Sequence, residues 1–525
     1  MKNDSVGFTI FRHPFRKKYV GVFALIFVLA GFSAAADDVQ VNADDTRQLI
    51  KQADKLVRRG MLIEAEKIFQ KVIAASPDNS VARLRLAHVY LKQRRLTDSY
   101  NLSLSAAKAE PKNSRAFAIL GATLLSAGNF TEARAVFGNA ILLNKKEHLA
   151  WAGFGMLDFY ENRMGESLAN LREAIYYDSE EPDYYFAFAQ VAARSERYRD
   201  AADAYNKFLA VSRDLDDERR DRIRGLINFL SFLGQKSSLY ATTGAEKTSV
   251  AFNLRGNRPI IKLKINGSDE PLNFVLDTGS GISVISDKTA KRLKIGSVAK
   301  GGFARGIGGN GKFEIVYGFL RQVDISDVKI RNVPVYIRKF HTDGAEIDGY
   351  IGLSLISKFL TTIDYGDLTF SLAKKDVNDL YAMDQAGISL PLRLTSSGFL
   401  SGEVQLQGVE QPLNFIVDTG ASVSVISDDV ATMDGISPFV TAEKMRVVGS
   451  AGITDGVPSF LLPKVSFGTH SRNSVAAIAL DLDMINEASG FEQAGILGGN
   501  FLRNYRMTFD FTNSRVTFIP IDKKP

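Results

Sequence analysis

Residues 271–287 read PLNFVLDTGSGISVISD, and residues 412–428 read PLNFIVDTGASVSVISD. The two stretches are identical at twelve of seventeen positions and lie 141 residues apart. In each, an apolar run leads directly into Asp-Thr-Gly, and a second apolar run follows. Such runs, broken by glycine, are typical of buried β-strands joined by a tight turn. The sequence therefore predicts a duplicated β unit with one carboxylate, Asp277 or Asp418, at the tip of each turn.

The duplication continues towards the end of each unit. Residues 347–353 (IDGYIGL) precede 359–365 (FLTTIDY), and residues 494–499 (AGILGG) precede 505–511 (YRMTFDF). Asp364 and Asp510 recur inside the later runs, where we expect them to make structural hydrogen bonds.

Changes in the sequence pattern along the chain indicate the expected domain boundaries. Short alternating runs and glycine-rich turns after residue 249 indicate an all-β region. We expect lobe 1 at 249–385 and lobe 2 at 386–525. The stretch 235–248 is polar and lacks periodicity, so it is predicted to be a linker.

Two Asp-Thr-Gly turns that face each other would bring Asp277 and Asp418 within hydrogen-bond reach. Carboxylates that close cannot both ionise, so the pair would share one proton. The ionised member can activate a water, and the protonated member can polarise a carbonyl group. We therefore predict one site split between the two units, with no metal ion and no cofactor.

These motifs resemble those of the aspartic protease clan, specifically its bacterial retropepsin-like domains, over residues 249–525. The resemblance implies peptide-bond hydrolysis with Asp277 and Asp418 as the catalytic pair, and interlocking threonines at Thr278 and Thr419. It also implies a supporting segment for each turn. The residues expected to support the site are Thr278, Gly279, Ser280, Thr419, Gly420 and Ala421 in the turns, and Ile351, Gly352, Leu497 and Gly498 behind them.

The same family closes a flap over its substrate. The candidate flap is the glycine-rich segment 301–311, with Gly306, Ile307, Gly308 and Gly309 at its centre; its counterpart is 448–456. Glycines suit a mobile hairpin that lies close to a substrate backbone. Neither segment carries the flap tyrosine of pepsins, which leaves open how the flap contacts substrate.

The two turns differ at one position, Ser280 in the first and Ala421 in the second. In the family, a hydroxyl at this position can donate to the carboxylate. We therefore predict that Asp277 is the ionised member of the pair and Asp418 the protonated one.

Residues 45–215 repeat with a period of 34. Two columns of small residues keep this step: Ala53, Ala87, Gly121, Gly155 and Ala189, and Ala65, Ser99, Ala133, Ser167 and Ala201. The pattern resembles the tetratricopeptide family, which implies an α-solenoid with a concave face for a peptide or protein partner. We expect helical repeats with a capping helix over 45–234, the cap running from Asp217 to Leu233.

The N-terminal segment resembles a secretory signal. Basic residues at 16–18 precede an apolar run at 19–32, and small residues at 33–36 follow. This pattern predicts a signal peptide at 1–36, cleaved near Ala36, and export to the periplasm of a Gram-negative bacterium. The alternative is an uncleaved inner-membrane anchor, the only membrane contact that we expect.

Composition excludes several classes of function. The chain has no cysteine, and its five histidines are scattered, which argues against disulfides, thiolate catalysis and a histidine metal site. The formal charge of +6 includes +4 from residues 1–36, leaving +2 for the remainder. A nearly neutral chain offers no electrostatic case for nucleic acid.

Three hypotheses follow from the sequence. The first is an exported aspartic endopeptidase whose repeats recruit its substrate or a partner protein. The second is an inactive periplasmic peptide-binding or scaffold protein on the same folds. The third is a peptidase whose solenoid assembles with a membrane complex.

Overall fold

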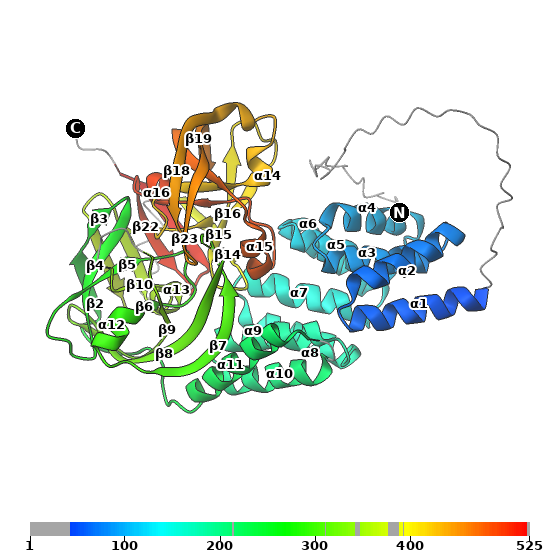
Figure 1. The fold of residues 1–525 in the computed structure, drawn as a ribbon, viewed down its shortest axis with the longest axis horizontal. Helices are drawn as coiled ribbons and strands as arrows, with labels where there is room; N and C mark the ends of the chain where they lie inside the picture. Colours follow the sequence, from blue (N-terminus) through cyan, green and yellow to red (C-terminus); the bar gives the residue numbers. More distant parts are fainter. Residues whose placement is uncertain are drawn as a thin grey trace, which may run out of the picture.

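The computed structural model describes residues 43–212, 215–309, 311–341, 347–375, 388–391 and 393–521. Over these residues an α-helical solenoid is followed by a β-rich half with two lobes, as predicted (Figure 1). The predicted signal segment at 1–36 and the expected lobe boundary at 385–386 lie outside the described residues. No helix in the described part of the chain has the length and apolar character needed to cross a membrane.

The helices of the solenoid pair in sequence order, one pair for each repeat. Their bounds are α1 Ala43–Arg58, α2 Leu62–Ala75, α3 Ser80–Lys92, α4 Leu96–Ala109, α5 Ser114–Ser126, α6 Phe130–Leu143, α7 His148–Tyr160, α8 Met164–Tyr177, α9 Pro182–Arg194 and α10 Tyr198–Val211. Asparagine caps fix two of the repeat boundaries, because the side chains of Asn79 and Asn113 accept hydrogen bonds from the first-turn amides of α3 and α5.

The two columns of small residues lie where helices cross. All ten positions are buried, the first column on the odd-numbered helices and the second on the even-numbered ones. A Cβ at Gly121 would lie 2.7 Å from the Phe137 ring, and one at Gly155 would lie 2.6 Å from Leu171. The Ser167 hydroxyl donates to the Gly155 carbonyl at 2.6 Å. Small residues therefore recur because the helices leave no room for larger ones.

The predicted cap is confirmed as a helix, α11, with bounds Asp217–Leu233. Asp216 caps its first turn by accepting a hydrogen bond from the Arg219 amide at 2.7 Å. One face of α11 packs on α10 and the other on strand β7 of lobe 1 (Figure 1). The helix therefore joins the solenoid to the β-rich half.

Lobe 1 is built on a strongly curved sheet. In the described residues its order is β1-β9-β6-β10-β5-β4-β8-β7, with β3 beside β4, and an additional β8–β9 pairing bends the sheet towards a barrel. Its strands are β1 Ala241–Gly244, β3 Asn253–Arg255, β4 Arg258–Ile265, β5 Leu272–Leu276, β6 Val284–Ser286, β7 Ser297–Arg305, β8 Lys312–Ile325, β9 Val328–Arg338 and β10 Gly349–Ile351.

Lobe 2 repeats this plan. The described order is β14-β15-β16-β21-β17-β20-β19-β18, with an additional β15–β19 pairing. Its strands are β14 Arg393–Leu394, β15 Leu400–Leu406, β16 Leu413–Val417, β17 Ser424–Ser427, β18 Val440–Val448, β19 Ile453–Phe467, β20 His470–Leu480 and β21 Gly495–Leu497. Short helices complete the lobes: α12 Asp287–Arg292, α13 Leu353–Ile356, α14 Asp428–Ala431, α15 Asp483–Ser489, α16 Gly499–Leu502 and the 3-10 helix η2 Ser437–Phe439.

A third sheet joins the lobes. Within the described residues its order is β13-β23-β22-β11-β12-β2, and its strands are β2 Lys247–Ala251, β11 Leu360–Asp364, β12 Thr369–Ala373, β13 Ile388–Pro391, β22 Tyr505–Asp510 and β23 Arg515–Pro520. Asp364 and Asp510 accept hydrogen bonds from backbone amides at the ends of β11 and β22, so they are structural, as expected.

The predicted linker at 235–248 is wrong in part. Strand β1 pairs with β9, and β2 begins at Lys247 and pairs with β12. Both are edge strands with exposed polar side chains, so the segment shows no apolar periodicity. Its partners lie far along the chain, and these distant pairings hold it in place.

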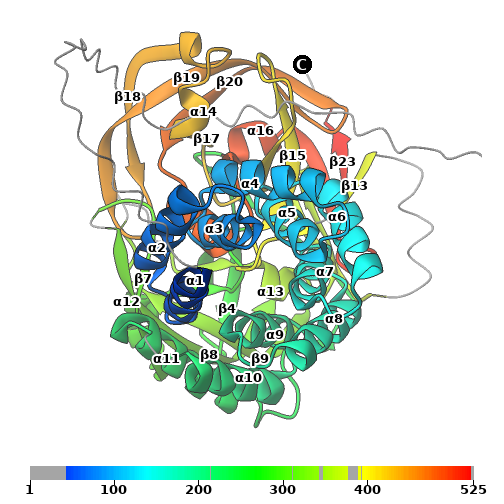
Figure 2. The same ribbon diagram turned by 90° about the vertical axis from the view of Figure 1, so that its right-hand side faces the viewer.

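The solenoid is docked on both lobes, and Figure 2 shows its helices in front of the β-rich half. On lobe 2, the Phe491 ring packs edge-on against Phe130 at 5.0 Å and tilts over Tyr160 at 4.9 Å. On lobe 1, Phe229 of α11 stacks on Tyr317 of β8 at 4.5 Å. A Cβ at Gly225 of α11 would lie 2.1 Å from the Lys300 carbonyl oxygen, so α11 and β7 are in backbone contact.

Candidate active site

The two Asp-Thr-Gly turns meet at the junction of the lobes. Strand β5 ends at Leu276 and leads into Asp277, and β16 ends at Val417 and leads into Asp418. The Asp277 amide donates to the Ile351 carbonyl at 3.0 Å, as the Asp418 amide does to the corresponding carbonyl of β21, also at 3.0 Å. Each turn is therefore tied to the strand behind it, where the predicted supporting segments lie.

The threonines lock the two turns together. The Thr278 hydroxyl donates to the Val417 carbonyl, and the Thr419 hydroxyl donates to the Leu276 carbonyl, both at 2.7 Å. Each hydroxyl also accepts the backbone amide of the other threonine, at 3.1 and 3.0 Å. Both side chains are fully buried. These four reciprocal bonds form a symmetric base for the site and join the lobes within one chain.

The carboxyl groups of Asp277 and Asp418 are hydrogen-bonded to each other. Each aspartate is partly exposed, although protein surrounds it on most sides. Gly279 and Gly420 make this approach possible: a Cβ on Gly279 would lie 2.3 Å from Asp418 Cγ, and one on Gly420 would lie 2.7 Å from Asp277 Cγ. Neither glycine has a positive φ, so both are required for space.

The two carboxyl groups are electrostatically unequal. Burial raises the pKa of Asp277 well above its usual range, and the Asp418 carboxyl raises it further. Burial also raises the pKa of Asp418, but hydrogen bonds from Asp277 and from nearby backbone amides oppose this rise. These shifts favour the neutral form more strongly at Asp277 than at Asp418, and the two carboxyls titrate as a pair.

The opposite assignment, predicted from Ser280, stays a prediction, but the hydroxyl on which it rests does not donate to Asp277. The Ser280 hydroxyl donates to the Ile282 carbonyl at 2.9 Å, where a free backbone acceptor is within local reach. Across the site, the amides of Gly420 and Ala421 donate to Asp418 Oδ1 at 2.7 and 3.2 Å. Backbone amides, which carry no sequence signal, therefore stabilise the charged form of Asp418.

Comparison with known families agrees with this geometry. Residues 261–355 and 402–501 match the family described as aspartyl protease. The two lobes belong to the aspartyl protease family. Residues 56–121 match the tetratricopeptide repeat family, and no curated protein matches the chain.

Solved structures with similar repeats score low. The tetratricopeptide repeat protein TTC0263 of Thermus thermophilus is 17% identical, with a TM-score of 0.31, over 35% of this chain and 98% of that one. PilF of Pseudomonas aeruginosa is 16% identical, with a TM-score of 0.27, over 37% of this chain and 86% of that one. Likenesses of this size say nothing of function.

Behind each turn of the protease lobes lies a serine that the sequence analysis did not single out. The Gly352 amide donates to Ser283 Oγ, and the Gly498 amide donates to Ser424 Oγ, both at 3.1 Å. Ser283 and Ser424 occupy the same position in the two copies of the motif. Their identity was visible in the sequence, but their role depends on strands that lie more than sixty residues later.

The candidate flap residues lie at the tip of a hairpin formed by β7 and β8. Gly308 and Gly309 have φ values of 91° and 56°, which explains the glycines. Ile307 packs into the same apolar cluster as Ala421 of the second active-site turn. The structure therefore brings this tip close to the base of the site.

The tip touches its counterpart in lobe 2, between β18 and β19. The Ala451 amide donates to the Ile307 carbonyl at 2.8 Å, and the Gly309 amide donates to the Ile453 carbonyl at 3.1 Å. A Cβ on Gly308 would lie 2.2 Å from the Gly452 carbonyl oxygen. The two hairpins are therefore in backbone contact at their tips.

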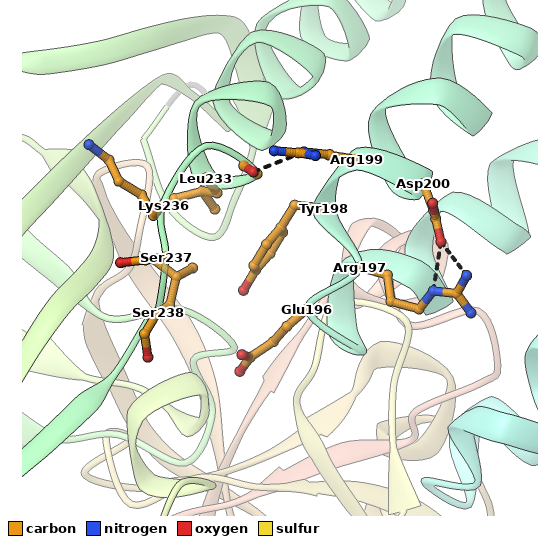
Figure 3. Close-up of a pocket in the computed structure, with 11 residues that line it drawn as sticks. Glu196, Arg197, Tyr198, Arg199, Asp200, Leu233, Lys236, Ser237 and Ser238 are labelled. Atoms are coloured by element: carbon orange, nitrogen blue, oxygen red, sulfur yellow. Dashed lines mark hydrogen bonds and ion pairs between the residues drawn. The ribbon is translucent and has the colours of Figure 1, made fainter.

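A pocket of about 320 Å³ lies away from the aspartates, at the seam between the solenoid and lobe 1 (Figure 3). It is lined by the turn between α9 and α10 and by the residues that follow α11. Two of its charged groups are already satisfied, because Arg197 pairs with Asp200 and Arg199 donates to the Gly234 carbonyl at 3.1 Å. Neither Asp277 nor Asp418 lines this pocket, so we do not assign it to the candidate active site.

The described residues contain no group of three or more histidine, aspartate, glutamate or cysteine side chains placed to hold a metal ion.

Proposed function

We propose that the chain is an exported aspartic endopeptidase that hydrolyses peptide bonds with a water held between Asp277 and Asp418. The observation that carries this proposal is the hydrogen-bonded pair of carboxyls, both with raised pKa. As part of the proposal we assign the shared proton to Asp277. Such a pair supplies a base and an acid at the same pH.

The steps follow from the proton distribution. Asp418 takes a proton from the water as its oxygen attacks the carbonyl carbon, while Asp277 gives its proton to the carbonyl oxygen. The resulting tetrahedral diol collapses when Asp418 returns a proton to the amide nitrogen and Asp277 takes one from a hydroxyl. The carbon–nitrogen bond breaks, and the pair regains its starting state.

The test is cleavage of a mixed library of synthetic peptides between about pH 3 and 8. We expect wild-type protein to cleave, and Asp277→Asn and Asp418→Asn each to lose roughly 10²–10⁴-fold in kcat, the range for general acid–base catalysis. The control is Asp269→Asn, which removes an exposed carboxylate from the turn between β4 and β5 of lobe 1.

Two results would reject the proposal. A wild-type protein that is inert at every pH but binds peptides would favour the alternative, an inactive peptide-binding or scaffold protein. A single aspartate variant with full activity would show that the pair does not form one site.

We also propose that the solenoid recruits the substrate or a partner protein, since tetratricopeptide repeats generally mediate protein–protein contacts. Its contacts with both lobes support this role, because a protein held by the repeats would lie beside the site. Deletion of repeats would be ambiguous, so we suggest a comparison of short peptides with whole proteins as substrates. Recruitment predicts a lower KM for proteins, and equal KM values would reject it.

Export is proposed from residues 1–36 alone. Fractionation of cells with N-terminal sequencing of the mature protein tests it. A new N-terminus near Asp37 in the periplasmic fraction is expected, and full-length protein in the cytoplasm would reject export. An intact N-terminus in the membrane fraction would instead indicate an anchor.

A further inference from the structure

The surfaces of the two lobes beside the aspartates, here called the walls, can be compared residue by residue, because the strand registers of the two lobes are equivalent. In lobe 1, Ser286 of β6 pairs with Arg338 at the end of β9. In lobe 2, Ser427 of β17 pairs with Leu480 at the end of β20. Ser286 and Ser427 are the same position of the duplicated motif, so Arg338 and Leu480 are structural equivalents with opposite character.

The wall of lobe 2 is apolar. Leu480 and the flap residue Ile307 pack against one cluster, whose buried members are Ile416, Val425, Val457, Ile478, Leu482 and Ile496. Ala421 of the active-site turn belongs to the same surface. A peptide side chain on this side of the site would therefore meet aliphatic groups.

The wall of lobe 1 has a different surface. Val275, the equivalent of Ile416, forms a small cluster with Ile260 and Ile347. Tyr350 packs on this cluster where lobe 2 has Ile496, and its ring lies edge-on to Phe340 at 5.2 Å. Tyr350 directly precedes Ile351, whose carbonyl accepts the Asp277 amide, so this wall adjoins the catalytic turn.

Arg338 lies between this wall and the flap tips. Its guanidinium carbon sits 3.9 Å from the centre of the Phe313 ring on β8, and Nη2 donates to the Ser450 carbonyl at the tip of the other hairpin. In the described part of the chain its contacts are thus a ring and a carbonyl oxygen, and its buried Nε has no hydrogen-bond partner.

The electrostatic surroundings of Arg338 also favour an anionic ligand. Burial lowers the pKa of Arg338, whereas Tyr350, Tyr336 and Asp277 raise it. Asp277 is thus within electrostatic range of a cation that also contacts both flap hairpins. No carboxylate of the described residues is hydrogen-bonded to Arg338, and a substrate carboxylate that reached its Nε would gain a charge-assisted hydrogen bond.

We propose that Arg338 forms a subsite for an acidic side chain of the peptide substrate, and that the equivalent place at Leu480 takes an aliphatic one. This inference rests on the proposed function, because it assigns the specificity of the same site. The two lobes are related by an approximate twofold axis through the aspartate pair. The acidic and aliphatic side chains therefore lie on opposite sides of the bond that is cut. Arg338 is a specificity-determining residue and takes no part in the chemistry.

The first experiment uses synthetic decapeptides with a common core, in which each position flanking the cleaved bond carries Glu in one peptide and Gln in its match. We expect one position at which Glu raises kcat/KM by roughly ten- to a hundredfold, the range of a charge-assisted hydrogen bond. Arg338→Leu should remove this preference and leave the Gln peptide cleaved at a similar rate. Arg338→Lys should retain part of it.

The matched control is Arg331→Leu, which removes an exposed cation from the same strand, β9, at a position paired with β1. It should leave the Glu preference unchanged. The reciprocal variant, Leu480→Arg, should create a second Glu preference on the other side of the cut bond. A purely structural role for Arg338 in holding the flap tips predicts equal losses with both peptides of a pair.

The failure of the subsite is distinguishable from the failure of the proposed function. If wild-type protein cleaves the peptides with no Glu preference at any position, the subsite is wrong and the peptidase stands. If it cleaves nothing, the peptidase is wrong, and the same peptide pairs are measured for binding to Asp418→Asn by fluorescence polarisation. Equal affinities in that assay would then overturn the subsite as well.

Discussion

Lobe 1 and lobe 2 build the base of the site with the same bonds. Thr278 and Thr419 exchange equivalent hydrogen bonds, and Ser283 and Ser424 hold the supporting glycines at equal distances. Above the base, the lobes differ. Arg338 stands where lobe 2 has Leu480, and α11 packs on strand β7 of lobe 1. The proposed chemistry needs two matching turns and would explain why the base is shared, whereas it places no such demand on the walls.

The largest expected effect tests the symmetry of the base. Thr278→Val and Thr419→Val each leave a buried carbonyl oxygen and a buried amide without a partner, and each unmet group costs about 1–3 kcal/mol. We expect similar losses of unfolding free energy, about 2–6 kcal/mol, in both variants. Thermal unfolding, with hydrogen exchange at the two turns, measures it. Unequal losses would show that the two threonines contribute unequally to the stability of the base.

The next test concerns the space beside each carboxyl. In Gly279→Ala and Gly420→Ala the new methyl group would collide with the opposite aspartate, so the pair must move apart. A displacement of about 1 Å can reduce catalysis roughly a hundredfold, and we expect at least that loss of kcat in both variants. Gly165→Ala, at a helical position of α8 with open space, is the control and should retain full activity.

A smaller effect tests the inequality of the pair through stability. Below the pKa of the unfolded state, about 3.9, a buried carboxyl with raised pKa does not lower the free energy of unfolding. As pH rises from there towards the folded pKa, it lowers the free energy of unfolding progressively. Asp277→Asn removes this cost. The Tm of the variant relative to wild type should therefore be least favourable near about pH 3 and improve above about pH 4.

The comparison with lobe 2 completes this test. Asp418→Asn should gain less Tm relative to wild type above about pH 4 than Asp277→Asn does, because backbone amides already favour the charged form of Asp418. A Tm difference that does not change with pH, measured by calorimetry, would mean that the Asp277 carboxyl is not perturbed.

The smallest expected effect concerns the residue after each motif. Because the Ser280 hydroxyl donates to a backbone carbonyl, Ser280→Ala should leave the pH profile of kcat/KM unchanged. Ala421→Ser, which makes the two turns alike, is the matched variant and should also leave it unchanged. A shift of either limb in Ser280→Ala would restore the sequence-based assignment of the ionised aspartate.

The sequence predicted the site residues that are repeated between the two units. The aspartates, threonines and glycines of the two turns stand at a constant spacing of 141 residues, and the structure brings them together. The 34-residue period likewise located the helix pairs, since small residues are required at each crossing.

The rest depended on contacts that no local pattern encodes. Arg338 and Leu480 are 142 residues apart, whereas the motifs are 141 apart, so the equivalence of these two residues is lost from a fixed alignment. Strands β1 and β2 were missed because their partners are distant. The expected hydrogen bond from Ser280 to Asp277 was wrong because a hydroxyl can rotate to whichever acceptor is nearer.

The reciprocal threonine bonds join residues of a single chain, and this has a kinetic consequence. A site assembled from two separate chains forms by a second-order encounter and weakens on dilution. Here the two halves are permanently tethered, so completing the site is a first-order folding step with a constant effective concentration. The proposed peptidase activity per molecule should therefore not change when the protein is diluted.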